Sequence, residues 1–267
     1  MKYSTAHEDL QKVFSFPSEE FIGRSIDEID DYKEIVSGPA YKDFSPRTMP
    51  GIKKEKVQPA LDWLAKALYD FIHCPEDTDF ETWHNETCLD FCNQIAHYYK
   101  EIPYGKAQKI VNMSFKYLFI LNDSQKYVAK FKNCHMALDQ YTLEWFIRYV
   151  LTKEERKDIS VTKIRDTSWS KLCCGDNHEE KYSYLWFQDR ICKYLKSGNS
   201  PYITEEGSHL SPFFAEFYIW SEMKIHLAME DLYAQGGKEK DFKEKSIFDK
   251  VPDLRVLLDE FETQYSL

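Results

Sequence analysis

Residues 54–72 read KEKVQPALDWLAKALYDFI, and this stretch decides the fold class. Its apolar residues recur at spacings of three and four: Val57, Leu61, Leu64, Ala65, Leu68 and Phe71. Such spacing places these side chains along one face of an α-helix. Pro75 follows, and a proline cannot continue a helix. The pattern therefore predicts a helix over Lys54–Ile72 with one buried face.

The same periodicity recurs along the chain in both directions from that stretch, and alternation of β-branched residues is scarce. It predicts further helices at Glu8–Phe14, Ile26–Val36, Phe80–Tyr99, Ala107–Leu121, Ser124–Phe131, Asp139–Leu151, Glu179–Leu195, Pro212–Ala234 and Pro252–Tyr265. Ser37–Gly51 contains three prolines and predicts an extended connection. Lys157–Lys171 is the least helical part and predicts a loop or one short strand.

These patterns together predict an all-α fold, a compact bundle of about ten helices. We interpret residues 1–267 as a single domain. The alternative is a bundle of two lobes, 52–150 and 151–267, preceded by an irregular N-terminal segment over 1–51. In that arrangement the unit Pro103–Asp139 lies at a cleft between the lobes.

The composition favours a soluble protein with a large core. Hydrophobic residues make up 43% of the chain and aromatic residues 16%, which supplies ample apolar surface to bury. No run approaches the roughly 20 apolar residues of a membrane span, and the first residues lack a signal-peptide pattern. Seven cysteines, an odd number, indicate reduced thiols. We therefore expect a cytoplasmic location and no membrane partner. The sequence does not indicate an oligomeric state.

Charge is distributed unevenly along the chain. The formal net charge is −10, which weighs against non-specific binding of nucleic acid. Between Lys100 and Lys132, however, seven lysines stand against two acidic residues. This segment is either a solvated helix face or a basic strip that faces phosphates or another anionic ligand.

Residues 102–113, IPYGKAQKIVNM, place a Pro-x-Gly turn before an apolar helix. Such a turn leaves backbone N–H groups at the helix start without intrahelical partners. We expect these groups to point outward, where they and the helix dipole suit a phosphate. Lys106 and Lys109 lie in the first turn, where a cation opposes the dipole, and an anionic ligand would explain their presence.

Residues 134–143, CHMALDQYTL, place a carboxylate at the start of a helix. Asp139 stands where an N-cap is expected, and capping is one interpretation of its role. A cap also holds a carboxylate rigidly, so a catalytic role for Asp139 is compatible with the first interpretation.

These two elements together resemble the catalytic core of the helix-hairpin-helix DNA glycosylase superfamily. Residues 105–111, GKAQKIV, are similar to the end of the family's hairpin, and residues 136–141, MALDQY, are similar to the element that delivers its catalytic aspartate. The resemblance covers about residues 102–145. Its long spacing is closer to the archaeal 8-oxoguanine glycosylase branch than to the shorter members.

The resemblance implies a base-excision enzyme that flips a modified base out of DNA and releases it. Asp139 would stabilise the positive charge that develops on the sugar, and Lys106 or Lys109 would attack the sugar as a neutral amine. DNA is then the expected partner, and no cofactor is expected, because the four-cysteine pattern of an iron–sulfur cluster is absent. Residues expected to bind substrate are Tyr104, Gly105, Lys116, His135, Tyr141, Trp145, Trp169 and Glu216.

Glu216 has two interpretations, because it lies within the apolar run Phe213–Trp220 and a buried carboxylate is costly unless paired. It is either a structural ion-pair partner, for example of Arg190 or Lys171, or an acid of a pocket with a raised pKa. His84, Cys88 and Cys92 share a helix face, but they fit a core better than a zinc site, and we expect no metal.

Two other classes of function stay open on the sequence. One is a non-catalytic helical binding or regulatory protein, such as a host-interaction or phage-defence component. The other is an enzyme that acts on a small anionic, nucleotide-like ligand. The acidic net charge favours these two classes, whereas the spacing of Lys106 and Asp139 favours the glycosylase.

Overall fold

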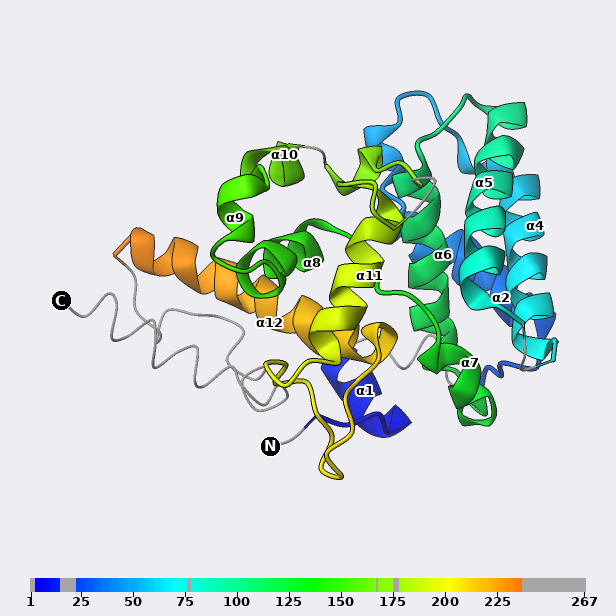
Figure 1. Cartoon of the computed structure of the whole chain (residues 1–267). Coiled ribbons are helices and arrows are strands. Elements are labelled where there is room, and N and C mark those ends of the chain that lie inside the picture. The colour runs from blue at the N-terminus through cyan, green and yellow to red at the C-terminus, as the bar shows by residue number, and fades with distance from the viewer. Residues whose placement is uncertain (1–2, 15–22, 76–77, 167, 175–177, 237–267) are drawn as a thin grey trace.

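The computed structural model describes residues 3–14, 23–75, 78–166, 168–174 and 178–236 (Figure 1). Within these ranges the chain is all-α, as predicted, and forms only isolated β-bridges besides its helices. The α-helices are α1 (His7–Phe14), α2 (Ile29–Ile35), α3 (Tyr41–Asp43), α4 (Lys54–His73), α5 (Phe80–Tyr98), α6 (Tyr104–Phe119), α7 (Val128–Lys132), α8 (Gln140–Trp145), α9 (Glu155–Asp158), α10 (Val161–Asp166), α11 (Tyr184–Leu195) and α12 (Pro212–Ala234). The helix predicted at Pro252–Tyr265 lies outside the described residues.

The centre of the bundle is α6, and all 16 of its residues are buried. Figure 1 shows α6 with α4 and α5 on one side and α11 on the other. Its apolar side chains join one continuous core with those of α4, α5, α11 and α12. In the described part of the chain, no helix combines the length and the apolarity needed to cross a membrane.

The long helices begin and end close to the predicted residues. The bounds of α12 are those predicted, because Pro212 can occupy a first turn and Gly236 adopts a positive φ of 77° just beyond the last turn. The largest difference is in α11, which starts at Tyr184 rather than Glu179. Ser183 caps this helix through a bond from the Trp186 N–H to its side chain at 3.3 Å.

Two predictions of irregular structure are wrong. Ser37–Gly51 is not extended: it contains most of a π-helical turn (Val36–Ala40), α3 and a 3₁₀ turn (Pro46–Thr48). Lys157–Lys171 holds part of α9, all of α10 and a 3₁₀ turn (Trp169–Lys171). These turns are too short to be stable alone, so packing against the core stabilises them, and periodicity does not reveal such packing.

Candidate functional site

A cleft of about 640 Å³ opens beside α6, at the start of α8. We call it the Asp139 cleft, and its lining residues are Phe14, Lys42, Asp43, Ser45, Pro46, Arg47, Lys109, Met113, Lys116, Tyr117, Asp139, Gln140, Tyr141, Trp169 and Trp220. Its volume lies within the range of small-molecule sites in proteins. The lining combines two carboxylates, cations and aromatic rings from segments far apart in the sequence.

Asp139 is held by four donors and is only 7% exposed. Its Oδ1 accepts the backbone N–H groups of Tyr141 at 2.9 Å and Thr142 at 3.1 Å, which confirms the predicted N-cap. Its Oδ2 accepts Nζ of Lys109 at 2.8 Å and Nε1 of Trp220 at 2.9 Å. Burial alone would raise the pKa of Asp139, but Lys109 and the other donors outweigh it and hold the pKa below its usual value. The carboxylate is therefore ionised and rigid.

Lys109 is the cation that the structure places beside Asp139. Its side chain is 6% exposed, and burial acts to lower its pKa. The negative charges of Asp139 and Glu216 outweigh burial and raise the pKa of Lys109. Lys109 is thus an ammonium ion in this arrangement rather than the neutral amine that a nucleophile requires.

A second buried ion pair lies next to the first. Nζ of Lys116 is 2.6 Å from Oε2 of Glu216, and their side chains are 2% and 3% exposed. The interpretation of Glu216 as a structural ion-pair partner is confirmed, but its partner is Lys116 rather than Arg190 or Lys171, and Arg190 pairs with Glu155. Burial raises the pKa of Glu216 and lowers the pKa of Lys116, against the attraction between them. Oε1 of Glu216 has no hydrogen-bond partner among the described residues.

Lys106 is directed away from Asp139. Its Nζ donates to the carbonyl oxygen of Phe44 at 2.9 Å and to Oγ1 of Thr48 at 2.6 Å. It also lies 5.0 Å from the centre of the Trp169 ring. Burial lowers the pKa of Lys106 to about 8. Lys106 is absent from the residues that line the cleft, so the structure separates it from the carboxylate with which we expected it to act.

The expectation of outward-pointing N–H groups at the start of α6 is wrong. The N–H of Gly105 donates to the carbonyl oxygen of Leu172 at 2.9 Å, and that of Lys106 donates to Pro103 at 2.9 Å. A Cβ at Gly105 would lie 2.0 Å from the carbonyl oxygen of Trp169. The backbone of 169–172 therefore covers this helix start, and a phosphate cannot occupy the same place.

Neither interpretation of the basic segment describes most of its lysines. Four of them, Lys106, Lys109, Lys116 and Lys130, are buried, with 5%, 5%, 2% and 4% exposed. Each is bonded to an acceptor within the protein. They face neither solvent nor an external phosphate backbone, because acceptors inside the protein neutralise or solvate them.

Other predicted residues divide between the cleft and the core. Tyr141 and Trp169 line the cleft, and the Tyr141 ring meets Trp220 edge to face at 5.3 Å. Trp145 is instead 1% exposed and packs on the ring of Tyr194 at 5.6 Å. Trp145 is therefore a core residue.

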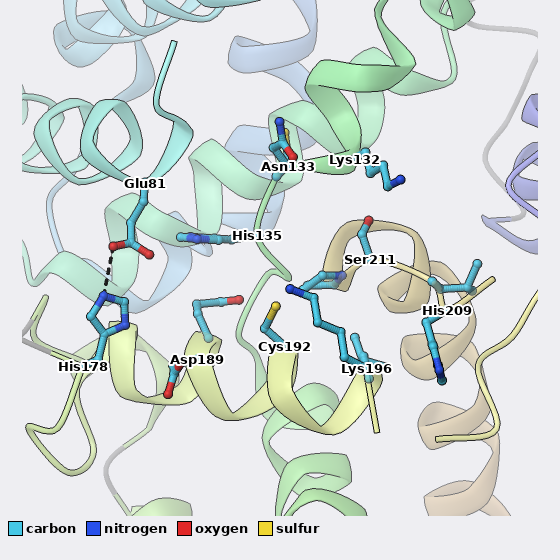
Figure 2. A pocket seen from close by; sticks show the side chains of 15 residues that line it. Glu81, Lys132, Asn133, His135, His178, Asp189, Cys192, Lys196, His209 and Ser211 are labelled. Atoms are coloured by element: carbon cyan, nitrogen blue, oxygen red, sulfur yellow. Dashed lines mark hydrogen bonds and ion pairs between the residues drawn. The ribbon is translucent and has the colours of Figure 1, made fainter. Parts of the chain in front are cut away.

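His135 and Tyr104 belong to a different part of the bundle. His135 lines a second cavity of about 350 Å³, which Figure 2 shows, and its Nδ1 bonds the Tyr184 hydroxyl at 3.0 Å. The hydroxyl oxygen of Tyr104 lies 3.5 Å from Nδ1 of His84. Burial lowers the pKa of His84 to about 3. The described residues include no group of three or more His, Cys, Asp or Glu side chains arranged to hold a metal ion.

Sequence reasoning missed Trp220, which donates to Asp139 from α12. Its position four residues after Glu216 puts both on one face of that helix. The available signal was Glu216 within the apolar run 213–220, because the helix face that carries this carboxylate had to meet other polar groups. Asp43, whose Oδ2 accepts the Tyr117 hydroxyl at 2.6 Å within the cleft, was also missed.

No protein-family profile, curated protein sequence or solved structure matches this chain significantly. Similarity therefore supplies no function for this protein.

Proposed function

We propose that this protein is a glycosylase that releases a modified base from DNA, with Asp139 as its catalytic carboxylate. The observation that carries the proposal is the fixation of an ionised Asp139 by four donors in the wall of an open cleft. The resemblance of residues 102–145 to helix-hairpin-helix glycosylases agrees with the choice of this residue.

The chemistry of base release suits a carboxylate of this kind. Positive charge develops on the sugar as the glycosidic bond breaks, and a preoriented negative group stabilises that charge with little reorganisation. Both oxygens of Asp139 are bonded, Oδ1 to backbone N–H groups of α8 and Oδ2 to Lys109 of α6 and Trp220 of α12, which holds the carboxylate in place. Trp169, Tyr141 and Trp220 present rings to the same cleft, and rings of this type stack on bases.

Hydrolytic base release is the reaction that the charges favour: a water molecule adds to the sugar carbon as the glycosidic bond breaks, one proton of the water leaves with the base, and no covalent lysine intermediate forms. Lys109 lies beside Asp139 but is held as an ammonium ion, and Lys106 does not line the cleft. We propose that Lys109 binds and orients the carboxylate. Cleavage of the DNA strand through a lysine adduct is then not expected.

A second candidate is hydrolysis of a small nucleotide-like ligand in the same cleft. Two observations favour it: four lysines of the basic segment are buried, and the chain carries a net charge of −10. Both reduce the attraction of duplex DNA, whose affinity for proteins rests largely on phosphate contacts. The cleft volume of about 640 Å³ accommodates a nucleotide.

The test is base release from oligonucleotides that carry oxidised, deaminated, alkylated or phage-type modified bases, with free nucleosides and nucleotides in parallel. We expect one substrate to be turned over and Asp139→Asn to lower turnover at least 100-fold. Asp62→Asn, an exposed change on α4, is the matched control. A borohydride trap in the same panel reports any lysine adduct.

Each outcome assigns the protein to one class. Release from DNA alone supports the glycosylase, and release from free nucleotides alone supports the second candidate. Full activity of Asp139→Asn protein overturns the catalytic role of Asp139. Folded protein that releases nothing and is not stabilised by any nucleotide is a binding or regulatory protein.

A further inference from the structure

Asp139 is delivered by a buried segment that belongs to no helix. Residues 134–138 connect the end of α7 to α8, and four of the five are buried. Buried backbone N–H and C=O groups must find hydrogen-bond partners. No neighbouring strand supplies partners here, because the described chain pairs only in isolated bridges elsewhere.

Two glutamine side chains take the place of a neighbouring strand. Gln108 of α6 accepts the N–H of Leu138 at 3.3 Å and donates to its carbonyl oxygen at 3.0 Å. Gln188 of α11 accepts the N–H of Met136 at 3.3 Å and donates to its carbonyl oxygen at 2.7 Å. Met136 and Leu138, two residues apart in the segment, are therefore each bonded at both the backbone N–H and the backbone C=O. The bonds to Leu138 come from α6 and those to Met136 come from α11.

Both side chains are buried, with Gln108 0% and Gln188 3% exposed. The amide of Gln108 is also fixed from behind. Its Oε1 accepts Nδ2 of Asn112 at 3.1 Å, and its Nε2 donates to the carbonyl oxygen of Gly105 at 3.1 Å. Nδ2 of Asn112 in turn donates to the Tyr184 hydroxyl on α11 at 2.9 Å. Hydrogen bonds that link α6 to α11 through Asn112 therefore set the orientation of the Gln108 side-chain amide.

We propose that Gln108 and Gln188 are positioning residues that set where Asp139 meets Lys109 and Trp220. A side-chain amide offers an N–H donor beside a carbonyl acceptor, so one glutamine can bond both the C=O and the N–H of a single residue and leave neither buried group unbonded. Removal of either glutamine side-chain amide would take away two of the hydrogen bonds that hold the backbone of 134–138 just before Asp139. The catalytic consequence of this placement rests on the proposed function, but the placement itself does not.

The indole N–H of Trp220 reports the position of Asp139 without any enzymatic assay. We would record the indole ¹H–¹⁵N resonances of the full chain, assign that of Trp220 with Trp220→Phe, and confirm its dependence on the carboxylate with Asp139→Asn. We expect Gln108→Met and Gln188→Met each to shift this resonance. Gln11→Met, which removes a bond from another glutamine to a backbone carbonyl, is the control expected to leave it unchanged.

An unchanged Trp220 resonance in both folded glutamine variants would overturn the proposal. If neither variant folds, the wild-type protein decides through amide hydrogen exchange. We expect the N–H groups of Met136 and Leu138 to exchange as slowly as those of α6, and exchange at open-loop rates would overturn the proposal. A shifted resonance accompanied by about 100-fold slower base release supports both proposals. If the variants shift the resonance but the wild-type protein itself releases no base, the positioning role is upheld and the glycosylase is rejected.

Discussion

Lys116 and Glu216 join the central helix α6 to α12 through an ion pair of 2.6 Å that is almost closed off from solvent, with side chains 2% and 3% exposed. Removing two charges from water is costly, and their attraction repays that cost only while both partners are present. The rings of Phe14 and Phe217 lie 4.6 and 4.8 Å from the ammonium group and further exclude water. The pair makes stability depend on two residues jointly.

Breaking this pair on one side is expected to be more damaging than removing it. Lys116→Met should lower the free energy of unfolding by about 3–5 kcal/mol, because Glu216 is left as an unpaired buried acid. Adding Glu216→Leu to Lys116→Met should recover at least half of that loss, since both charges are then gone. Urea denaturation of the wild type, the two single variants Lys116→Met and Glu216→Leu, and the double variant measures the coupling. Additive losses in the double variant would show that the two side chains do not interact.

Gly105→Ala is expected to destabilise the protein by about 3 kcal/mol, at the upper end for added volume in a packed interior. The new Cβ would lie 2.0 Å from the carbonyl oxygen of Trp169 and 2.9 Å from the backbone nitrogen of Leu172, so backbone has to move. Gly198→Ala is the control, because nothing lies within 4 Å of its Cβ position. Thermal unfolding of both variants checks the difference. Equal melting temperatures would mean that 169–172 does not rest on α6.

Two replacements of Asp139, by asparagine and by alanine, should differ in their effect on stability but not in their effect on activity. Asparagine retains a capping oxygen, so Asp139→Asn should cost less stability than Asp139→Ala, with a difference of about 1 kcal/mol from the cap. Both changes remove the negative charge and should abolish turnover alike. Chemical denaturation and base release on the same samples test this. Restored activity in the asparagine variant alone would show that the site needs the cap geometry rather than the charge.

The pH dependence of Asp139 follows from the direction of its pKa shift. The pKa is lowered in the folded protein, so the stabilisation by this carboxylate is present above its usual value of 3.8 and is lost as pH falls through the folded value. The stability difference between wild type and Asp139→Asn should therefore shrink only below about pH 4. Urea denaturation from pH 7 down to pH 3 follows it. A difference that vanished already near pH 6 would contradict a lowered pKa.

Lys106 should make the free energy of unfolding depend on pH in the alkaline range. Its pKa is about 8 in the folded protein against 10.5 usually, so the unfolded chain binds more protons between these values. Stability contributed by this group therefore rises as pH increases from about 8 to 10.5. Denaturation at pH 7 and pH 10 should show this rise in wild type but not in Lys106→Met. Lys132→Met, an exposed change, should keep it, and loss of the rise in that control would assign it to general charge effects.

The helices that sequence reasoning predicted best are those whose ends carry local signals. Pro212 and Gly236 bound α12, and Asp139 caps α8 as expected. The turns between residues 36 and 48 carry two prolines and a glycine, which argue against helix locally. Contacts with α6, made by residues far away in the chain, stabilise those turns. Local pattern cannot contain that information.

The site was predictable only where a residue's role is local. The capping geometry identified Asp139, but the lysines of α6 suggested a surface helix, because buried lysines are rare unless paired. Their partners are not neighbours in sequence: Asp139 follows Lys109 by 30 residues, and Glu216 lies on α12. The choice between Lys106 and Lys109 depended on which way each side chain leaves the helix. That direction is set by the packing of 44–48 and 169–172.

The complete enclosure of α6 also has a consequence for the order in which the protein can be made. A ribosome releases α6 well before α12, which supplies Glu216 and Trp220. Until α12 has been synthesised, Lys116 lacks Glu216 as its ion-pair partner, and the side of α6 that packs on α12 is exposed to water. A chain that lacks α12 would therefore leave apolar side chains of α6 and the charge of Lys116 without their native partners. We therefore expect the native packing around α6 to form only after α12 has been synthesised, because α12 supplies the carboxylate that pairs with Lys116.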